Sequence, residues 1–210
     1  MISYRKATKN DLDAVAHLAA QSFGDYPFFS FALRSGFDDD TAYRAYLEKL
    51  FRIHIKANMR AHHCFVGVLD GKIVSTALLQ DPEKGRVTIG QYILSGGVRL
   101  IHPVGFSRIL DFFSISEQAH ADCARTCPDA WYLELLAVDS DMKGQHLGSD
   151  MIQDCLIPFV QANTGKQLAL ITNTDQNRKF YLKNGFQEFS QCKLRCKDKT
   201  IGNWSFLQAV

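Results

Sequence analysis

The spacing of apolar residues switches between a helical and a strand period along the chain of 210 residues. Residues 2–5 are expected as a strand, and a helix capped by Thr8 or Asn10 follows it. The apolar positions of this helix are Leu12, Val15, Ala16, Ala19 and Phe23. Acidic residues 38–40 introduce a second helix, as the helix dipole favours. One face of that helix carries Tyr43, Tyr46, Leu47, Leu50, Phe51 and His54.

The pair Asp70-Gly71 separates two apolar runs, at residues 64–69 and 72–79. Both residues of such a pair accept the positive φ of a type I′ turn, so the runs are predicted to form an antiparallel hairpin. Residues 81–102 include a glycine-rich piece that the pattern assigns to no element. An amphipathic helix is expected after it, over residues 103–124.

A strand, a helix and a second strand are predicted in the C-terminal half. The strands are expected over residues 131–138 and 167–172, and the helix begins near Gln145. Pro158 is expected to kink or shorten this helix. Because a helix connects the two strands, they are predicted to be parallel with a right-handed crossover.

The chain is expected to close with one more helix and two more strands. The helix covers residues 177–184 and ends at Gly185, which suits the left-handed position after a helix. The strands cover residues 186–194 and 201–209.

Length and charge limit the classes of function. A chain of this length suffices for one well-buried α/β domain, expected over residues 1–210, and is short for two. The formal net charge is +2, and no basic block interleaved with aromatic residues occurs. Neither nucleic acid nor a membrane is therefore expected as a partner.

The six cysteines lie mostly inside apolar runs, and no secretory segment opens the chain. This favours reduced thiols and a cytoplasmic location. Cys123 and Cys127, like Cys192 and Cys196, have a spacing that metal ligands can share, but no pair of histidines completes either set. No metal site is expected.

The turn at residues 138–149 joins a predicted strand to a predicted helix and contains two glycines. A helix start leaves backbone N–H groups unpaired and carries a partial positive charge. A glycine-containing turn aimed at such a start can hold a phosphate or pyrophosphate. This junction is the first candidate site.

Two motifs stand in this region. The first is the run Lys-Gly-Gln-His-Leu-Gly at residues 143–148. The second consists of an apolar strand at residues 170–173, a helix with the pattern Asn-x-x-x-Tyr at residues 177–181, and the pair Gly-Phe at residues 185–186. Together they resemble the GNAT superfamily of N-acetyltransferases, whose acetyl-CoA motif is Arg/Gln-x-x-Gly-x-Gly/Ala after a strand. The chain departs from that motif at its first position, a lysine, and at His146, which replaces the first glycine.

The resemblance implies a fold of the α/β (α+β) class, a GNAT-like domain with a mixed, mostly antiparallel sheet of about six to seven strands. Helices are expected on both faces of the sheet. A bulge in the strand that ends at Val138 is expected to splay it from its parallel neighbour and to leave a slot with unpaired backbone groups.

The slot is implied to hold acetyl-CoA, with coenzyme A as the product. The pantetheine arm would pair with the strand backbone, the amides of the turn would bind the pyrophosphate, and Asn177 would contact one of the two. Alternatively, Asn177 serves only as a helix N-terminal residue. The implied cofactor residues are Leu136, Ala137, Val138, Lys143, Gly144, Gln145, His146, Leu147, Gly148, Ser149 and Asn177.

His146 is the position that departs most from the motif. A left-handed backbone with a histidine side chain would cost about 1 kcal/mol, whereas a helical backbone would accept histidine without strain. We expect the helical conformation.

The implied reaction is attack of an amine on the thioester carbonyl through a tetrahedral intermediate. Tyr181 is expected as the general acid near the sulfur, although it could be only a core aromatic residue. The Val138 N–H is expected to polarise the carbonyl. Glu134, a lone carboxylate in an apolar strand, is the candidate base, and burial is expected to raise its pKa. A water chain is the alternative base; His54, His62 and His63 have no positional support.

The acceptor is expected to be the primary amine of a small molecule, because the resemblance is nearest to the small-molecule and antibiotic acetyltransferase branch. Tyr26, Phe28, Phe29 and Phe31 are candidates for its pocket wall, with Asp25 or Asp38 attracting the amine. A peptide or protein amine, and a non-catalytic acyl-CoA binding or sensing module, are the alternatives. The chain is expected to be a monomer or a homodimer.

Overall fold

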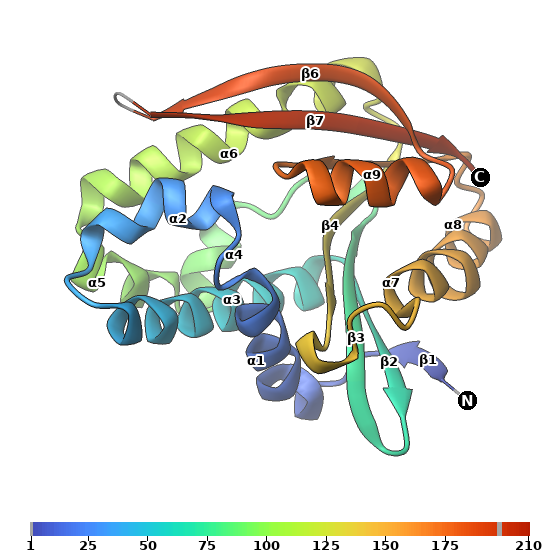
Figure 1. The fold of residues 1–210 in the computed structure, drawn as a ribbon, viewed down its shortest axis with the longest axis horizontal. Helices are drawn as coiled ribbons and strands as arrows, with labels where there is room; N and C mark the ends of the chain where they lie inside the picture. The colour runs from blue at the N-terminus through green and yellow to red at the C-terminus, as the bar shows by residue number, and fades with distance from the viewer. Residues whose placement is uncertain (1, 197–198) are drawn as a thin grey trace.

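The structure is a computed structural model that describes residues 2–196 and 199–210. Seven strands form one sheet in the order β1-β2-β3-β4-β5-β7-β6 (Figure 1). β4 and β5 are parallel and every other neighbouring pair is antiparallel, which confirms the mixed, mostly antiparallel sheet. The strands are β1 Ser3–Lys6, β2 His63–Leu69, β3 Lys72–Gln80, β4 Trp131–Val138, β5 Gln167–Thr172, β6 Gln187–Cys196 and β7 Lys199–Ala209.

Helices cover both faces of the sheet, as expected. One hydrophobic cluster packs the N-terminal helices and α6 against the sheet, and a second packs the segment Met151–Leu156, α8 and α9 against the other face. Figure 1 shows α2 to α6 gathered on one side of β4, and α7 and α8 on the other. The helices are α1 Leu12–Phe23, α2 Pro27–Leu33, α3 Asp40–Ala61, α4 Ile89–Leu94, α5 Ile101–Val104, α6 Phe106–Thr126, α7 Leu147–Asp150, α8 Ile157–Ala162 and α9 Asp175–Lys183.

Local chemistry explains where several elements begin and end. The Asp39 side chain accepts the amide of Ala42 at 2.8 Å and so caps α3. Asp70 and Gly71 have φ of 50° and 80°, so the predicted type I′ hairpin between β2 and β3 is confirmed. Gly105, with φ of 85°, starts α6 later than the sequence pattern suggested.

The segment between β3 and α6 is largely helical, which the sequence pattern did not assign. It holds α4, a 3-10 turn over Gly97–Leu100 and α5. Gly96, with φ of 106°, separates α4 from the turn. These helices are too short for periodicity to identify them, and tertiary packing against α3 supports them.

A β-bulge interrupts β4 at Glu134. Leu133 pairs with Leu79 of β3 and Leu135 pairs with Leu78, so Glu134 is the extra residue. Leu133 consequently packs in the second cluster, whereas Leu135 packs in the first. The bulge therefore turns Glu134 towards α3 and α6.

The bulge also changes which residues share a face. Simple alternation along the strand would place Glu134 on the same face as Leu136 and Val138, and the bulge prevents this. Leu136 packs against the second cluster, and Val138 lies beside Gly148. Tyr132 does lie on the side of Glu134, because its ring contacts the ring of His120 on α6.

β4 and β5 separate soon after they begin. They pair only at Trp131 with Leu168 and at Tyr132 with Ala169. β5 continues to Thr172 beside β7, while β4 continues beside β3. The predicted splay of the parallel pair is thus present.

The helical stretch after β4 runs through α7, a π-helical segment over Met151–Leu156 and α8. Pro158 lies in the first turn of α8. The proline has no amide to donate, and the wider π-helical turn before it accommodates that loss. Among the described residues, no helix is long and apolar enough to cross a membrane.

Candidate active site

A cleft of about 1390 Å³ opens where β4 and β5 splay apart. Its first part, called here the α7/α9 half, is lined by the turn before α7, by residues 173, 174, 176 and 177, and by residues 180, 181, 183 and 184. Its second part, the α4/α6 half, is lined by α2, the middle of α3, α4 and α6. Residues 133–136 and Val138 of β4 separate the two halves.

The free edge of β4 offers backbone groups to the slot. Hydrogen-bonded and non-hydrogen-bonded pairs alternate along an antiparallel ladder. The Asp139 amide donates to the Val74 carbonyl at 2.8 Å, so Ala137 forms the next hydrogen-bonded pair with β3. The backbone groups of Leu136 and Val138 therefore point to the other edge, into the slot. Ala137 does not reach the slot, and its side chain is buried in the first cluster.

The turn before α7 presents amides that have no protein acceptor. Within the described residues, the N–H groups of Lys143, Gly144 and residues 146–149 donate to no backbone or side-chain acceptor, whereas Gln145 donates to Met142. Unpaired amides converging at a helix start suit an anion such as a pyrophosphate. The donor set of this turn therefore fits the pyrophosphate of coenzyme A.

His146 has φ of 60° and ψ of 7°, a left-handed conformation. The expected helical conformation is wrong. The position needs the positive φ that a glycine adopts freely, and histidine holds it with strain of about 1 to 2 kcal/mol. Gly144, two residues earlier, also has a positive φ of 87°.

Asn177 and Tyr181 project from α9 towards the slot. Thr174, not Asn177, caps the helix, because its hydroxyl accepts the Asn177 amide at 3.1 Å. The side chain of Asn177 is therefore left to line the cleft. Tyr181 also lines the cleft and is 8% exposed, with its ring packed against Phe186. Burial raises the pKa of Tyr181 above its ordinary value, so its hydroxyl stays protonated at neutral pH.

Tyr26 lies at the C-terminal end of β5. The sequence suggested this residue only as part of the wall of the acceptor pocket. Its hydroxyl accepts the Asn173 amide at 2.7 Å and lies 3.0 Å from the Thr172 hydroxyl. Phe28 and Phe29 line the cleft as expected, while Phe31 and Asp38 do not.

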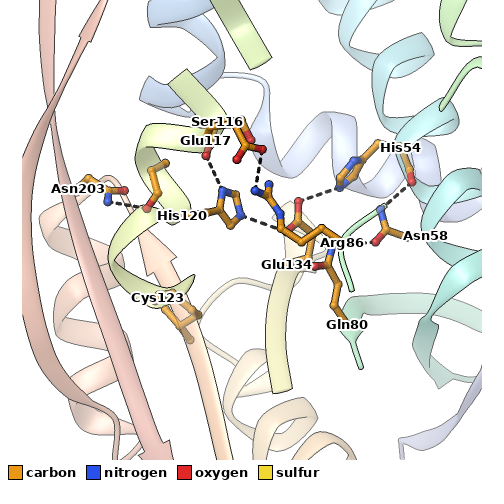
Figure 2. Close-up of polar contacts among 12 residues, drawn as sticks. His54, Asn58, Gln80, Arg86, Ser116, Glu117, His120, Cys123, Glu134 and Asn203 are labelled. Atoms are coloured by element: carbon orange, nitrogen blue, oxygen red, sulfur yellow. Dashed lines mark hydrogen bonds and ion pairs between the residues drawn. The ribbon is translucent and has the colours of Figure 1, made fainter. Parts of the chain in front are cut away.

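Glu134 lies between two histidines from different helices (Figure 2). Its Oε1 is 3.4 Å from Nε2 of His54 on α3, and its Oε2 is 3.3 Å from Nε2 of His120 on α6. His120 Nδ1 lies 2.6 Å from the Ser116 carbonyl oxygen, and His54 Nδ1 lies 2.8 Å from the Tyr92 hydroxyl. These contacts define the His54–Glu134–His120 cluster.

The ring nitrogens of both histidines lie beside polar partners. His120 has an oxygen atom beside each ring nitrogen, from the Ser116 carbonyl and from the Glu134 carboxylate. The Tyr92 hydroxyl can donate to Nδ1 of His54 and leave Nε2–H for Glu134. Two imidazole rings therefore hold the carboxylate between them.

The electrostatics of Glu134 differ from the sequence expectation. Burial alone would raise its pKa, but the hydrogen bond and charge of His120, with His54 and Arg86, hold the pKa well below its usual range. The expected upward shift is thus wrong. Burial lowers the pKa of His54 despite the neighbouring carboxylate. Glu134 is therefore ionised at neutral pH.

Polar groups behind His54 hold this arrangement in place. The amide of buried Asn58 donates to the His54 carbonyl at 3.0 Å and accepts from Gln80 at 3.1 Å. Arg86 approaches from the other side and pairs with Glu117 at 2.7 Å, as Figure 2 shows. No local motif marks the two histidines, since packing of separate helices brings them to Glu134.

Comparison with known proteins agrees with this geometry. Residues 101–188 match the family model of the acetyltransferase (GNAT) domain. A search of curated proteins finds no match. A Corynebacterium glutamicum structure described as histone acetyltransferase HPA2 and related acetyltransferase is 20% identical, with 99% of this chain and 95% of that chain covered and a TM-score of 0.65.

Two further solved structures have the same fold over nearly the full length. An agmatine N-acetyltransferase is 16% identical, with 100% of this chain and 99% of that chain covered and a TM-score of 0.60. The Drosophila melanogaster polyamine N-acetyltransferase, which forms N-acetylagmatine, is also 16% identical, with both chains fully covered and a TM-score of 0.60. Residues 101–188 thus match the acetyltransferase (GNAT) domain model, and the whole chain shares the fold of these N-acetyltransferase structures.

Proposed function

We propose that the chain transfers the acetyl group of acetyl-CoA to a primary amine of a small molecule. One observation carries this proposal: a single cleft joins unpaired amides at a helix start to an ionised, mostly buried carboxylate. The first feature suits a pyrophosphate and the second suits an ammonium group. The strands from β1 to β7 share one sheet, which supports treating residues 1–210 as a single catalytic domain.

The α7/α9 half would hold acetyl-CoA, which supplies an activated acetyl thioester. Leu136 and Val138 would pair with the pantetheine arm through the backbone groups that face the slot. The pyrophosphate would bind at the amides of Gly144 and residues 146–149. Asn177 is placed to contact the arm between them.

Tyr181 and Val138 have the chemistry that acyl transfer needs at the sulfur and the carbonyl. The raised pKa of Tyr181 keeps a proton available for a departing thiolate, as a general acid requires. The Val138 N–H faces the slot, where it can stabilise negative charge on a carbonyl oxygen. Tyr181 thus combines a packed ring with a hydroxyl near the cleft, so a structural role and a catalytic role coexist.

Glu134 would bind and orient the ammonium group, because the two histidines hold its carboxylate in place. A carboxylate with a depressed pKa is a weak base by itself. Water in the open cleft, the alternative base, would then carry the proton of the ammonium group away. Glu134 then has an electrostatic role, while His54 supplies an imidazole that is neutral at physiological pH.

The test is acetyl-CoA binding followed by amine-dependent release of coenzyme A. Acetyl-CoA at about 100 times its dissociation constant should raise the free energy of unfolding by about 2.7 kcal/mol. Release of free thiol should then require an added amine. Binding without release for any small amine or peptide would favour a non-catalytic acyl-CoA binding module, and release with peptides alone would favour a peptide or protein acceptor.

A further inference from the structure

The α4/α6 half has walls that are apolar to an unusual degree for an open cleft. Seven large apolar side chains are exposed among the described residues, and five of them line this half. The five are Ile89, Ile93, Val98, Phe106 and Leu110. Soluble proteins seldom gather exposed apolar side chains without a ligand or partner for them.

The inner end of this half is aromatic and leads to the carboxylate. Phe28 and Phe29 of α2 pack against Phe112 of α6, with ring centroids 5.7 and 6.2 Å apart. Tyr92 of α4 stacks on the His54 ring and contacts Phe113. An occupant that places its amine at Glu134 would therefore lay its body along rings and aliphatic side chains.

The other carboxylates around this half are already paired. Glu117 binds Arg86 at 2.7 Å, and Asp25 binds Arg44 at 2.8 Å from an almost fully exposed position. Among the described lining residues, Glu134 is thus the one carboxylate without an arginine or lysine partner. A second ammonium group in the occupant would meet Arg86 and apolar walls instead of a free carboxylate.

We propose that the acceptor is a primary monoamine with an apolar body, either alkyl or arylalkyl, and that polyamines are poor acceptors. This inference rests on the proposed acetyl transfer and specifies its substrate class. The ammonium group binds at Glu134, and the body fills the α4/α6 half up to its open mouth. Leu110 and Ile93 at the mouth then determine specificity, since they are the walls that a distal polar group would contact.

The experiment compares matched amines at saturating acetyl-CoA by following release of coenzyme A thiol. Hexylamine and 1,6-diaminohexane differ only in the second ammonium group, and butylamine and octylamine extend the series. We expect kcat/KM to rise about fourfold for each methylene that is buried, and to favour hexylamine over the diamine by about tenfold or more. Equal or higher kcat/KM for the diamine or for spermidine overturns the inference and leaves the proposed acetyl transfer standing.

Variants of Leu110 and Ile93 test the same proposal by changing the protein instead of the amine. Leu110→Glu and, separately, Ile93→Glu place a carboxylate on the apolar wall and should shift the preference about tenfold towards the diamine. Leu182→Glu is the matched control, because Leu182 is 48% exposed on α9 and Leu110 is 52% exposed. An unchanged preference in both mouth variants, or an equal shift in the control, contradicts the inference. No thiol release with any amine or peptide, despite bound acetyl-CoA, overturns both the inference and the proposed function.

Discussion

The left-handed backbone of His146 allows a direct test of the geometry of the turn before α7. An L-residue in this conformation carries strain of about 1 to 2 kcal/mol, which glycine does not. Glycine in turn gives the unfolded chain more freedom, at a cost of about 0.4 to 1 kcal/mol. The net expectation for His146→Gly is a gain of about 1 kcal/mol in the free energy of unfolding. For a chain of this length, that gain raises the melting temperature by about 2 to 4 °C.

Two glycine variants serve as controls in the same thermal and urea melts. Lys143 has φ of −58°, so Lys143→Gly relieves no strain and should lower the free energy of unfolding by about 0.5 to 1 kcal/mol. Thr164 has φ of 60°, so Thr164→Gly should stabilise the fold as His146→Gly does. If His146→Gly destabilises the protein to the same extent as Lys143→Gly, the strain assigned to the turn is refuted.

Three further predictions concern the catalytic groups and one helix cap. Tyr181→Phe should lower kcat about 100-fold or more while the dissociation constant of acetyl-CoA, measured by calorimetry, stays near wild type; an unchanged kcat would remove the acid role. Glu134 has a pKa held below its ordinary 4.5, at about 2, so its ionised form stabilises the fold above pH 4.5 and this contribution is lost as the pH falls towards 2. Urea melts over that window should show a smaller loss of stability for Glu134→Gln, and identical pH slopes would contradict the cluster. Asp39→Ala should lower the free energy of unfolding by about 1 kcal/mol, because α3 loses its cap; a thermal melt equal to wild type would show that the cap contributes nothing.

Local sequence signals accounted for most of the sheet. The Asp70-Gly71 pair specified its hairpin through backbone chemistry alone, and the apolar runs of β4 and β5 with a helix between them indicated a parallel pair. The short helices between β3 and α6 left no periodic signal, since each has six residues or fewer.

The sequence indicated only one of the two halves of the candidate site. Its α7/α9 half follows from a contiguous motif, so the positions of Gly144 and Tyr181 could be anticipated. The resemblance implied a bulge in β4 but not its position at Glu134, because the alternating pattern of this strand reads the same with or without an extra residue. The cluster around Glu134 depends on that bulge and on the packing of α3 against α6, which places His54 beside a residue 80 positions later.

The sequence also could not show the protonation of the site. Composition gave no reason to expect two histidines beside the carboxylate, and partial burial alone argued for a raised pKa of Glu134. The two histidines reverse that shift, because charge and hydrogen bonding outweigh burial at Glu134. His120 lies on the buried face of an amphipathic helix, which is the one sequence feature that marks it as unusual.

The most direct test of the account is the initial rate of coenzyme A release from acetyl-CoA, measured with and without hexylamine. The account predicts slow release without the amine, release that rises and saturates with amine concentration, and a fall of about 100-fold in kcat/KM for Glu134→Gln. Release that is independent of the amine, or equal in wild type and Glu134→Gln, would contradict the central claim that this cleft is an amine acetylation site.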